Sequence, residues 1–263
     1  MSICIAIAVP DGIALAADSQ TTWNQTITQV KEAGTGRIVS LEKPIQQPIS
    51  WSKMARKLFD IKIQDSIFGV CVAGTAILNH KTIYSLFKSL EASYEGENNY
   101  DAIVKYFVHG VQKQMQVQLG TEELKNATQR LSVDFIIAGY ENKDVSKPRI
   151  ESHMVFSGKI MIDNNLNDSG HIVRWRNTKG SARFGGCWIG RTEFISHLVN
   201  QKSNLPPIQG QYELLSLADA VDYTRFLVDF TCDYQRFAIM VPDCGKPIIS
   251  AKLTPSSYSE EII

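Results

Sequence analysis

The second residue of the chain, Ser2, stands directly behind the initiator methionine. A serine hydroxyl is a weak nucleophile and needs a base that accepts its proton. A residue at the chain terminus carries such a base on its own backbone, the α-amine, with an ordinary pKa of about 8. Because an acylated amine has no basic lone pair, this chemistry requires removal of Met1, and aminopeptidases remove methionine from before small residues such as serine. Ser2 is therefore a candidate nucleophile.

The composition is that of an ordinary globular protein. We expect one domain over residues 1–263, with 44% hydrophobic and 21% charged residues. Lys and Arg number 27, as do Asp and Glu, so no net charge favours binding to nucleic acid or to an anionic membrane. The opening MSICIAIAVP has no basic residue, and PDG interrupts it too early for a signal peptide or a membrane span. We therefore expect a cytoplasmic protein.

Cysteines and histidines give no sign of a metal site. The five cysteines are odd in number, scattered and mostly within apolar runs, which favours reduced core thiols over disulfides or zinc ligands. The five histidines lack the short spacings of metal ligands. We expect neither a metal nor an organic cofactor.

Two β-hairpins are predicted in the first third of the chain. Apolar runs at residues 3–9 and 13–17 flank a PDG turn, in which Pro presets one backbone dihedral and Gly supplies the positive one. Strand character resumes in RKLFDIKIQDSIFGVCVAG, and a turn near residues 64–66 predicts a second hairpin that ends at Gly74.

The segments after each hairpin differ in their periodicity. Residues 21–52 are polar, contain Gly and Pro and show no sustained period, so we expect a long loop or an extended excursion. Apolar residues recur at three- and four-residue spacing over residues 83–94 and again over 103–119. Both segments are predicted to be amphipathic helices that cover a sheet.

The middle of the chain predicts more strands. SVDFIIAGY at 132–140 and PRIESHMVFSG at 148–158 form a strand pair around a polar turn. Residues 159–181 are polar and give no clear assignment. ARFGGCWIG predicts a strand that ends at Gly190.

The last part combines helices with a hairpin. We expect a short helix at 191–200, a Pro-Pro loop at 206–207, a long helix at 213–234 and a final hairpin within 237–253. Hairpins and helix pairs segregate along the chain instead of alternating as βαβ units, which favours an α+β fold of mainly antiparallel sheets stacked between helical layers.

The sequence segments DGIALAADS, RKLFDI, VCVAGTA and DFIIAGY, together with the order of the predicted elements, resemble the proteasome-type N-terminal-nucleophile (Ntn) hydrolases. The resemblance covers nearly the whole chain. The ending VDFTCDYQRF, followed by CGKPIISAKL, looks most like the bacterial Anbu branch. The resemblance implies a four-layer αββα sandwich.

The resemblance also implies roles for four residues. The family has its nucleophile at the first mature position and an aspartate 16 positions later, an interval that Ser2 and Asp18 keep. Lys57 matches the family lysine, which Asp18 would hold and whose ammonium would lower the pKa of the Ser2 amine by like-charge repulsion. Gly74 matches the glycine whose N–H forms the oxyanion hole.

The resemblance also implies a supporting aspartate, and this sequence departs from the family pattern at two places. The family places an aspartate near the end of the last long helix, which Asp229 fits best, with Asp233 as its rival. The nucleophile is Ser rather than the usual Thr, which removes a methyl group that helps to fix the rotamer. GRT at 190–192 and the Cys232 region replace supporting hydroxyls of the family, so weak activity is expected.

From these features we expect a peptidase that cleaves peptides or unfolded proteins in a homo-oligomeric ring or stack. An ATP-dependent unfoldase is a candidate partner that no residue identifies. An Ntn amidase for a small amide, and an inactive proteasome-like scaffold subunit, remain alternatives because a fold alone fixes neither substrate nor activity.

Overall fold

Two five-stranded antiparallel sheets form the body of the protein. The computed structural model describes residues 2–53, 55–119, 131–157, 160–162, 165–167, 170–177, 183–199, 211–238 and 242–263. The first sheet has the order β14-β1-β2-β15-β16 and the second β13-β10-β9-β6-β5.

The strands of the first sheet are β1 (Ile3–Val9), β2 (Gly12–Asp18), β14 (Gly185–Gly190), β15 (Ile248–Thr254) and β16 (Ser257–Ile262). Those of the second are β5 (Leu58–Ile63), β6 (Ser66–Gly74), β9 (Ser132–Tyr140), β10 (Pro148–Phe156) and β13 (Gly170–Arg176). Smaller pairs are β3 (Thr21–Lys31) with β4 (Ile38–Ser52), β7 (Ile77–Leu78) with β8 (Lys81–Thr82), and β11 (Ile160–Ile162) with β12 (Asn165–Asn167).

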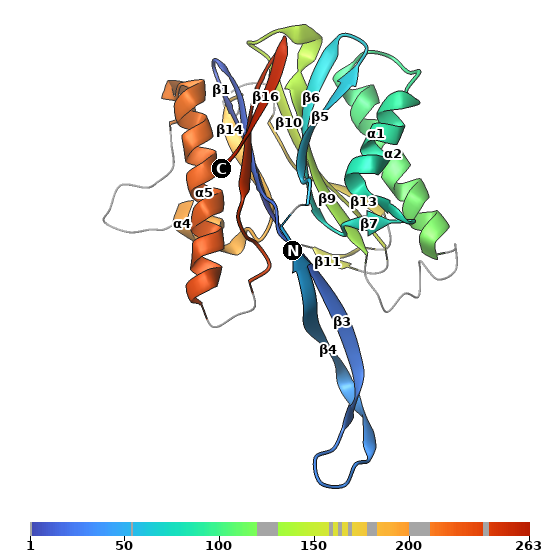
Figure 1. The fold of residues 1–263 in the computed structure, drawn as a ribbon. Coiled ribbons are helices and arrows are strands. Elements are labelled where there is room, and N and C mark those ends of the chain that lie inside the picture. Colours follow the sequence, from blue (N-terminus) through green and yellow to red (C-terminus); the bar gives the residue numbers. More distant parts are fainter. Residues whose placement is uncertain are drawn as a thin grey trace.

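Helices lie on both outer sides of the sheet pair (Figure 1). One side carries α1 (Ile83–Ala92) and α2 (Tyr100–Leu119), and the other carries α4 (Glu193–Val199) and α5 (Leu217–Phe237). Single 3₁₀ turns occur at η1 (Glu141–Lys143) and η2 (Tyr212–Leu214). Among the described residues, no helix has the length and apolarity that crossing a membrane requires.

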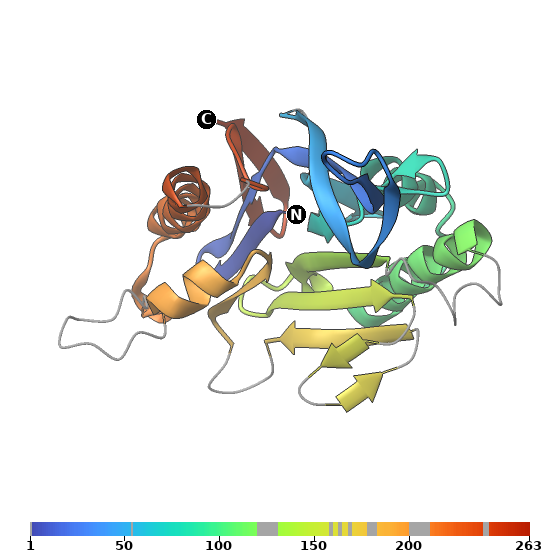
Figure 2. The ribbon, with the colours of Figure 1, turned by 90° about the horizontal axis from the view of Figure 1, so that it is seen from below.

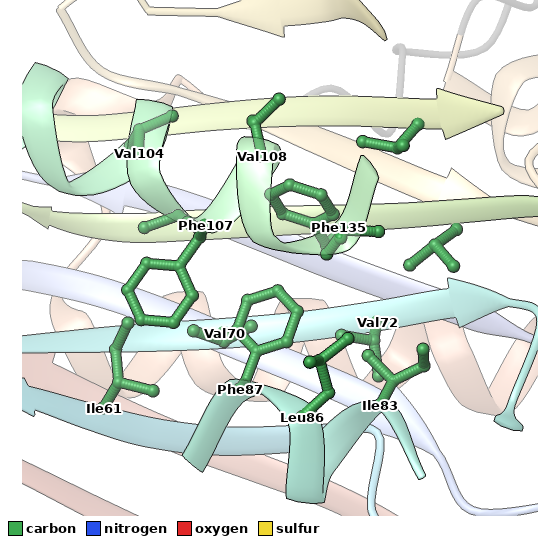
Figure 3. Close-up of a cluster of buried hydrophobic side chains, with 14 of the residues drawn as sticks. Ile61, Val70, Val72, Ile83, Leu86, Phe87, Val104, Phe107, Val108 and Phe135 are labelled. Carbon is green, nitrogen blue, oxygen red and sulfur yellow. The ribbon is translucent and has the colours of Figure 1, made fainter. Parts of the chain in front are cut away.

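Three clusters of buried side chains account for the packing of these elements. One lies between the second sheet and the helices α1 and α2, where the rings of Phe87 and Phe107 stack at 5.1 Å between centroids (Figure 3). A second joins the facing sides of the two sheets. The third packs α4 and α5 on the outer side of the first sheet. Burial on both sides explains why β1 and β2 are apolar at nearly every position.

Alternation along β1 determines which residues meet the other sheet. Cys4 and Ala6 belong to the cluster between the sheets, whereas Ile3 and Ile5 face α4 and α5. Because successive side chains of a strand point to opposite faces, Ser2 continues the series that faces the second sheet.

Several predicted elements are confirmed. The opening hairpin is β1–β2, with Val9 opposite Gly12, and the second hairpin is β5–β6, with Leu58 opposite Cys71. The two amphipathic helices are α1 and α2, and the strand pair in the middle of the chain is β9–β10. All five cysteines are free and buried, as expected of core thiols.

Of the two predictions for residues 21–52, the long loop is wrong and the extended excursion is confirmed. This segment is a two-stranded hairpin, β3–β4, that projects from the body (Figures 1 and 2). We call it the arm. Side chains from Thr28 to Ser40 are exposed, so no buried face imposes the alternation by which strands are recognised. Register shifts near Trp23 and Ile27 interrupt the period further.

The final hairpin was predicted too early in the chain. Its strands are β15 and β16, so its first strand begins only at Ile248. The exposed, charged side chains of β16 hid the second strand. Residues 159–181, left unassigned, contribute β13 to the second sheet. The Pro-Pro loop at 206–207 lies outside the described residues.

Candidate active site

A buried ion pair joins the first hairpin to the second. Lys57, directly before β5, places its Nζ 2.9 Å from both carboxylate oxygens of Asp18 at the end of β2. The exposed fractions of the two side chains are 6% and 0%. Lys57 also donates to the backbone carbonyl of Gln20. The predicted contact between Asp18 and Lys57 is therefore present.

Backbone donors complete the environment of the Asp18 carboxylate. Oδ1 accepts the N–H of Ile3 at 2.9 Å, and Oδ2 accepts those of Gln20 and Gly245, each at 3.1 Å. A buried carboxylate is stable only when its lost hydration is replaced by such bonds. Because Ile3 is one of these donors, Asp18 also fixes the backbone next to Ser2.

Ser2 itself is 5% exposed and is held through its carbonyl group. The N–H of Arg191, just after β14, donates to that oxygen at 2.7 Å. Gly190 precedes Arg191 with φ +91°, and a Cβ there would overlap the Ser2 carbonyl oxygen. Glycine at position 190 thus allows two backbones to approach closely. Met1 lies outside the described residues.

Gly74 lies at the same end of the sheet pair as Ser2. Cys4 Sγ contacts the carbonyl oxygen of Val72 at 3.3 Å, so β1 and β6 face each other there. Leu15, opposite Ala6 on β1, packs over Gly69, so higher numbers on β1 correspond to lower numbers on β6. Ser2 lies two residues before Cys4, and Gly74 lies two residues after Val72. Because the two strands run in opposite directions, Ser2 and Gly74 are at the same end of the sheet pair.

The backbone at Gly74 requires glycine. Its φ is +86°, and a Cβ would lie 2.5 Å from the carbonyl oxygen of Ser132. Thr75 N–H donates to that same oxygen at 2.8 Å. Gly74 is exposed, so its backbone is accessible to a ligand.

Asp229 has a different environment. Its carboxylate contacts Lys246 Nζ at 2.6 Å, and that of Asp233 lies 3.7 Å from the same atom. All three side chains are about half exposed. Both rival aspartates thus share one lysine, and within the described residues neither forms a hydrogen bond to Asp18 or Lys57.

Sequence reasoning missed two residues next to the site, Asp243 and Gln235. Asp243 Oδ2 accepts from Arg191 Nε at 2.8 Å and lies 2.7 Å from Nη2. Burial acts to raise the pKa of Asp243, but the Arg191 guanidinium outweighs it and holds that pKa below its ordinary value. Gln235, fully buried near the end of α5, could have been found as the one amide among the apolar and threonine side chains that α5 buries in the described structure.

Cysteines near the site do not compete with Ser2 as nucleophiles. Burial raises the pKa of Cys232 to about 12 and that of Cys4 well above its ordinary value. The thiolate is the reactive form of cysteine, and these groups remain thiols at neutral pH. In the part of the chain that is described, no three His, Cys, Asp or Glu side chains gather as metal ligands would.

Comparison of structures identifies the fold. Anbu (ancestral beta-subunit) from Yersinia bercovieri matches with a TM-score of 0.57 at 14% identity, over 99% of this chain and 86% of that one. This chain has the fold of the Anbu proteins. The helical assembly of the Anbu complex from Pseudomonas aeruginosa matches with a TM-score of 0.58 at 14% identity, over 99% and 86% of the two chains. The resemblance to the Anbu branch and the α+β class of mainly antiparallel sheets are thereby confirmed.

A third Anbu structure, a mutant from Hyphomicrobium sp., matches with a TM-score of 0.56 at 14% identity, over 100% of this chain and 87% of that one. Comparison by sequence alone finds no matching family model and no matching curated protein. The relation to the Anbu proteins therefore rests on the path of the backbone.

Proposed function

We propose that this chain is a proteasome-like Ntn peptidase in which Ser2, exposed by removal of Met1, is the nucleophile. The observation that carries the proposal is the shared oxygen of Asp18. Oδ1 accepts both the Lys57 ammonium and the N–H of Ile3, each at 2.9 Å. The Asp18 carboxylate thus bridges the buried Lys57 ammonium and the backbone N–H of Ile3, the residue that follows the candidate nucleophile.

The chemistry follows from this placement. Ser2 Oγ attacks a peptide carbonyl and passes its proton to the Ser2 α-amine. The Lys57 ammonium disfavours a second positive charge nearby, so it lowers the pKa of the amine and keeps more of it neutral. The amine then protonates the leaving group, an ester to Ser2 remains, and water hydrolyses that ester. Gly74 N–H stabilises the oxyanion in both steps.

Asp229 supports the site indirectly in this proposal. Its partner Lys246 directly follows Gly245, whose N–H binds Asp18. Asp229 therefore restrains the backbone of Gly245 from the outer surface, and Asp233 shares that role through the longer contact to the same lysine.

The architecture supports the assignment to the Ntn class. Two facing sheets with helices on both outer sides fit a single four-layer αββα domain. The Pseudomonas aeruginosa Anbu structure is described as a helical assembly, and we propose that this chain also forms a homo-oligomer. A peptide or unfolded-protein substrate and cytoplasmic location complete the proposal, and an unfoldase partner stays a prediction.

Hydrolysis of fluorogenic peptides by wild type and Ser2→Ala tests the function. We expect turnover by the wild type and a loss on the order of 1000-fold or more in the variant, because the nucleophile and its placement act as a unit. A matched control is Ser250→Ala, since Ser250 is a buried serine in β15 of the same sheet.

The same assay separates the alternatives. An amidase would hydrolyse small acyl-amides through Ser2 but no longer peptides. A scaffold subunit would retain Met1 and hydrolyse neither class, and either result would contradict the peptidase proposal.

A further inference from the structure

The loop between α5 and β15 contacts both halves of the candidate site. We call residues 242–247 the α5–β15 loop. On one side, Gly245 N–H donates to Asp18 Oδ2 at 3.1 Å, and the carbonyl of Gly245 accepts from Ser19 N–H at 3.2 Å. These two bonds attach the loop to the strand end that carries the Asp18–Lys57 ion pair.

The other side of the loop reaches the backbone of the candidate nucleophile. The Asp243 carboxylate binds the Arg191 guanidinium at 2.7 and 2.8 Å. The backbone N–H of Arg191 donates to the Ser2 carbonyl oxygen at 2.7 Å. The position of Asp243 therefore limits where Arg191, and with it Ser2, can lie.

One fully buried side chain of α5, Gln235, binds two successive residues of this loop. Gln235 Oε1 accepts the N–H groups of Asp243 at 2.9 Å and of Cys244 at 3.1 Å. Gln235 is 0% exposed, so water cannot replace these bonds when the amide is lost. Its Nε2 lies 3.6 Å from Cys244 Sγ. The amide thus holds two successive residues of the loop at once.

We propose that Gln235 and Asp243 are positioning residues of the Ser2 site. Gln235 orders the α5–β15 loop, and the loop then places Asp18 through Gly245 and Ser2 through Asp243 and Arg191. The inference rests on the proposed function, because it assigns to these residues the alignment of nucleophile and ion pair. Neither side chain contacts substrate in this account.

Gln235→Leu removes both accepting contacts while keeping a similar volume. In a peptidase assay we expect kcat to fall about 10- to 100-fold with KM changed less than about twofold, because small misplacement of reacting groups lowers the rate more than binding. Gln235→Glu keeps an accepting oxygen and is expected to recover most of kcat.

Thr231→Val is the matched control. Thr231 lies one turn earlier on α5, is 0% exposed, and donates to the carbonyl of Leu227 at 2.9 Å within its own helix. It therefore reports what any lost polar contact in this helix does to the protein. We expect kcat to stay within about twofold of wild type for this variant.

Asp243→Asn provides a second test that leaves α5 intact. The change weakens the hold on Arg191, and we expect kcat to fall about tenfold. Because Gln235 and Asp243 act through the same loop, the effects of Gln235→Leu and Asp243→Asn should be less than additive in the double variant. This variant also keeps the test decisive if Gln235→Leu fails to fold.

Amide hydrogen exchange separates this inference from the proposed function. We expect the amides of Gly245 and Arg191 to exchange at least about tenfold faster in Gln235→Leu than in Thr231→Val, whether or not the wild type hydrolyses peptides. A wild type without hydrolysis would end the proposed function but leave this measurement valid. Equal exchange, or equal kcat in the Gln235→Leu and Thr231→Val variants, would overturn the inference.

Discussion

Among the described residues, two lysine–aspartate pairs come closer than 3 Å, and they lie in very different surroundings. Lys57 and Asp18 are buried, with Nζ 2.9 Å from both carboxylate oxygens. Lys246 and Asp229 come closer, at 2.6 Å, but are 53% and 43% exposed. In the first pair, three backbone N–H groups also bind the carboxylate. Burial and the number of bonds, more than the distance, distinguish the two.

The difference indicates how each pair acts. Exposed pairs contribute about 0–1 kcal/mol because water screens them and their side chains lose entropy. Removing one partner of a buried pair leaves an uncompensated charge and costs about 3–5 kcal/mol. We therefore assign the buried pair to the chemistry of Ser2 and the exposed pair to an outer restraint on the α5–β15 loop.

The largest effect is expected from Asp18→Ala. The free energy of unfolding should fall by about 3–5 kcal/mol, because the Lys57 ammonium is left buried without a counter-charge. Denaturant titration measures this. The double variant Asp18→Ala with Lys57→Met should recover part of the loss, since it removes the unpaired charge. If Asp18→Ala lowered the free energy of unfolding no more than Asp229→Ala does, the distinction between the buried and the exposed pair would be contradicted.

Gly74→Ala extends the comparison from side chains to the backbone. We expect kcat/KM for peptides to fall on the order of 100- to 1000-fold, because the Cβ would displace the backbone whose N–H is the proposed oxyanion donor. Gly34→Ala in the arm is the control, since Gly34 has φ +96° with nothing within 4 Å of the added Cβ. Similar kcat/KM in the two variants would remove Gly74 from the proposed site.

Asp134 tests what happens to a buried carboxylate that lacks the bonds of Asp18. Burial raises its pKa to about 6, although Arg174 lies 3.6 Å from Oδ2. With the folded pKa raised, folding favours the protonated form, so the contribution of Asp134 to stability is fully present below about pH 4 and is lost as pH rises through about 6.

Asp134→Asn should therefore stabilise the protein by on the order of 2 kcal/mol above pH 6 and very little below pH 4. Denaturant titrations at several pH values measure the difference. A constant difference across this range would show that Asp134 does not titrate with a raised pKa.

Asp229→Ala should have the smallest effect. We expect a loss below about 1 kcal/mol in the free energy of unfolding, because the pair with Lys246 is exposed. The loss of kcat should likewise be smaller than for Gly74→Ala. A loss of several kcal/mol would mean that Asp229 belongs to the buried network, as a direct support of the site.

Local patterns predicted much of the fold and part of the site. The apolar runs on either side of the PDG turn predicted β1 and β2. The roles of Ser2 and Asp18 came from the resemblance, and the structure brings the Asp18 carboxylate to the N–H of Ile3, next to Ser2. The contact of Asp18 with Lys57 also followed, but only from the resemblance, because no local pattern links residues 39 positions apart.

Other features had no local signal. Side chains from Thr28 to Ser40 of the arm are exposed, so no buried face imposes a period on this stretch. The bond between Arg191 and Asp243 spans 52 positions and depends on where α5 ends. Asp229 was selected by its position on the last helix, but its partner Lys246 lies beyond that helix, in a segment predicted as a strand. Such contacts are products of tertiary packing.

The most direct test of the account is the intact mass of the protein, purified from its own host and treated with a peptide epoxyketone. This probe reacts with an N-terminal nucleophile through both its hydroxyl and its amine. We predict a chain that begins at Ser2 and gains one adduct, which Ser2→Ala does not gain. A chain that retains Met1 and gains no adduct would contradict the central claim.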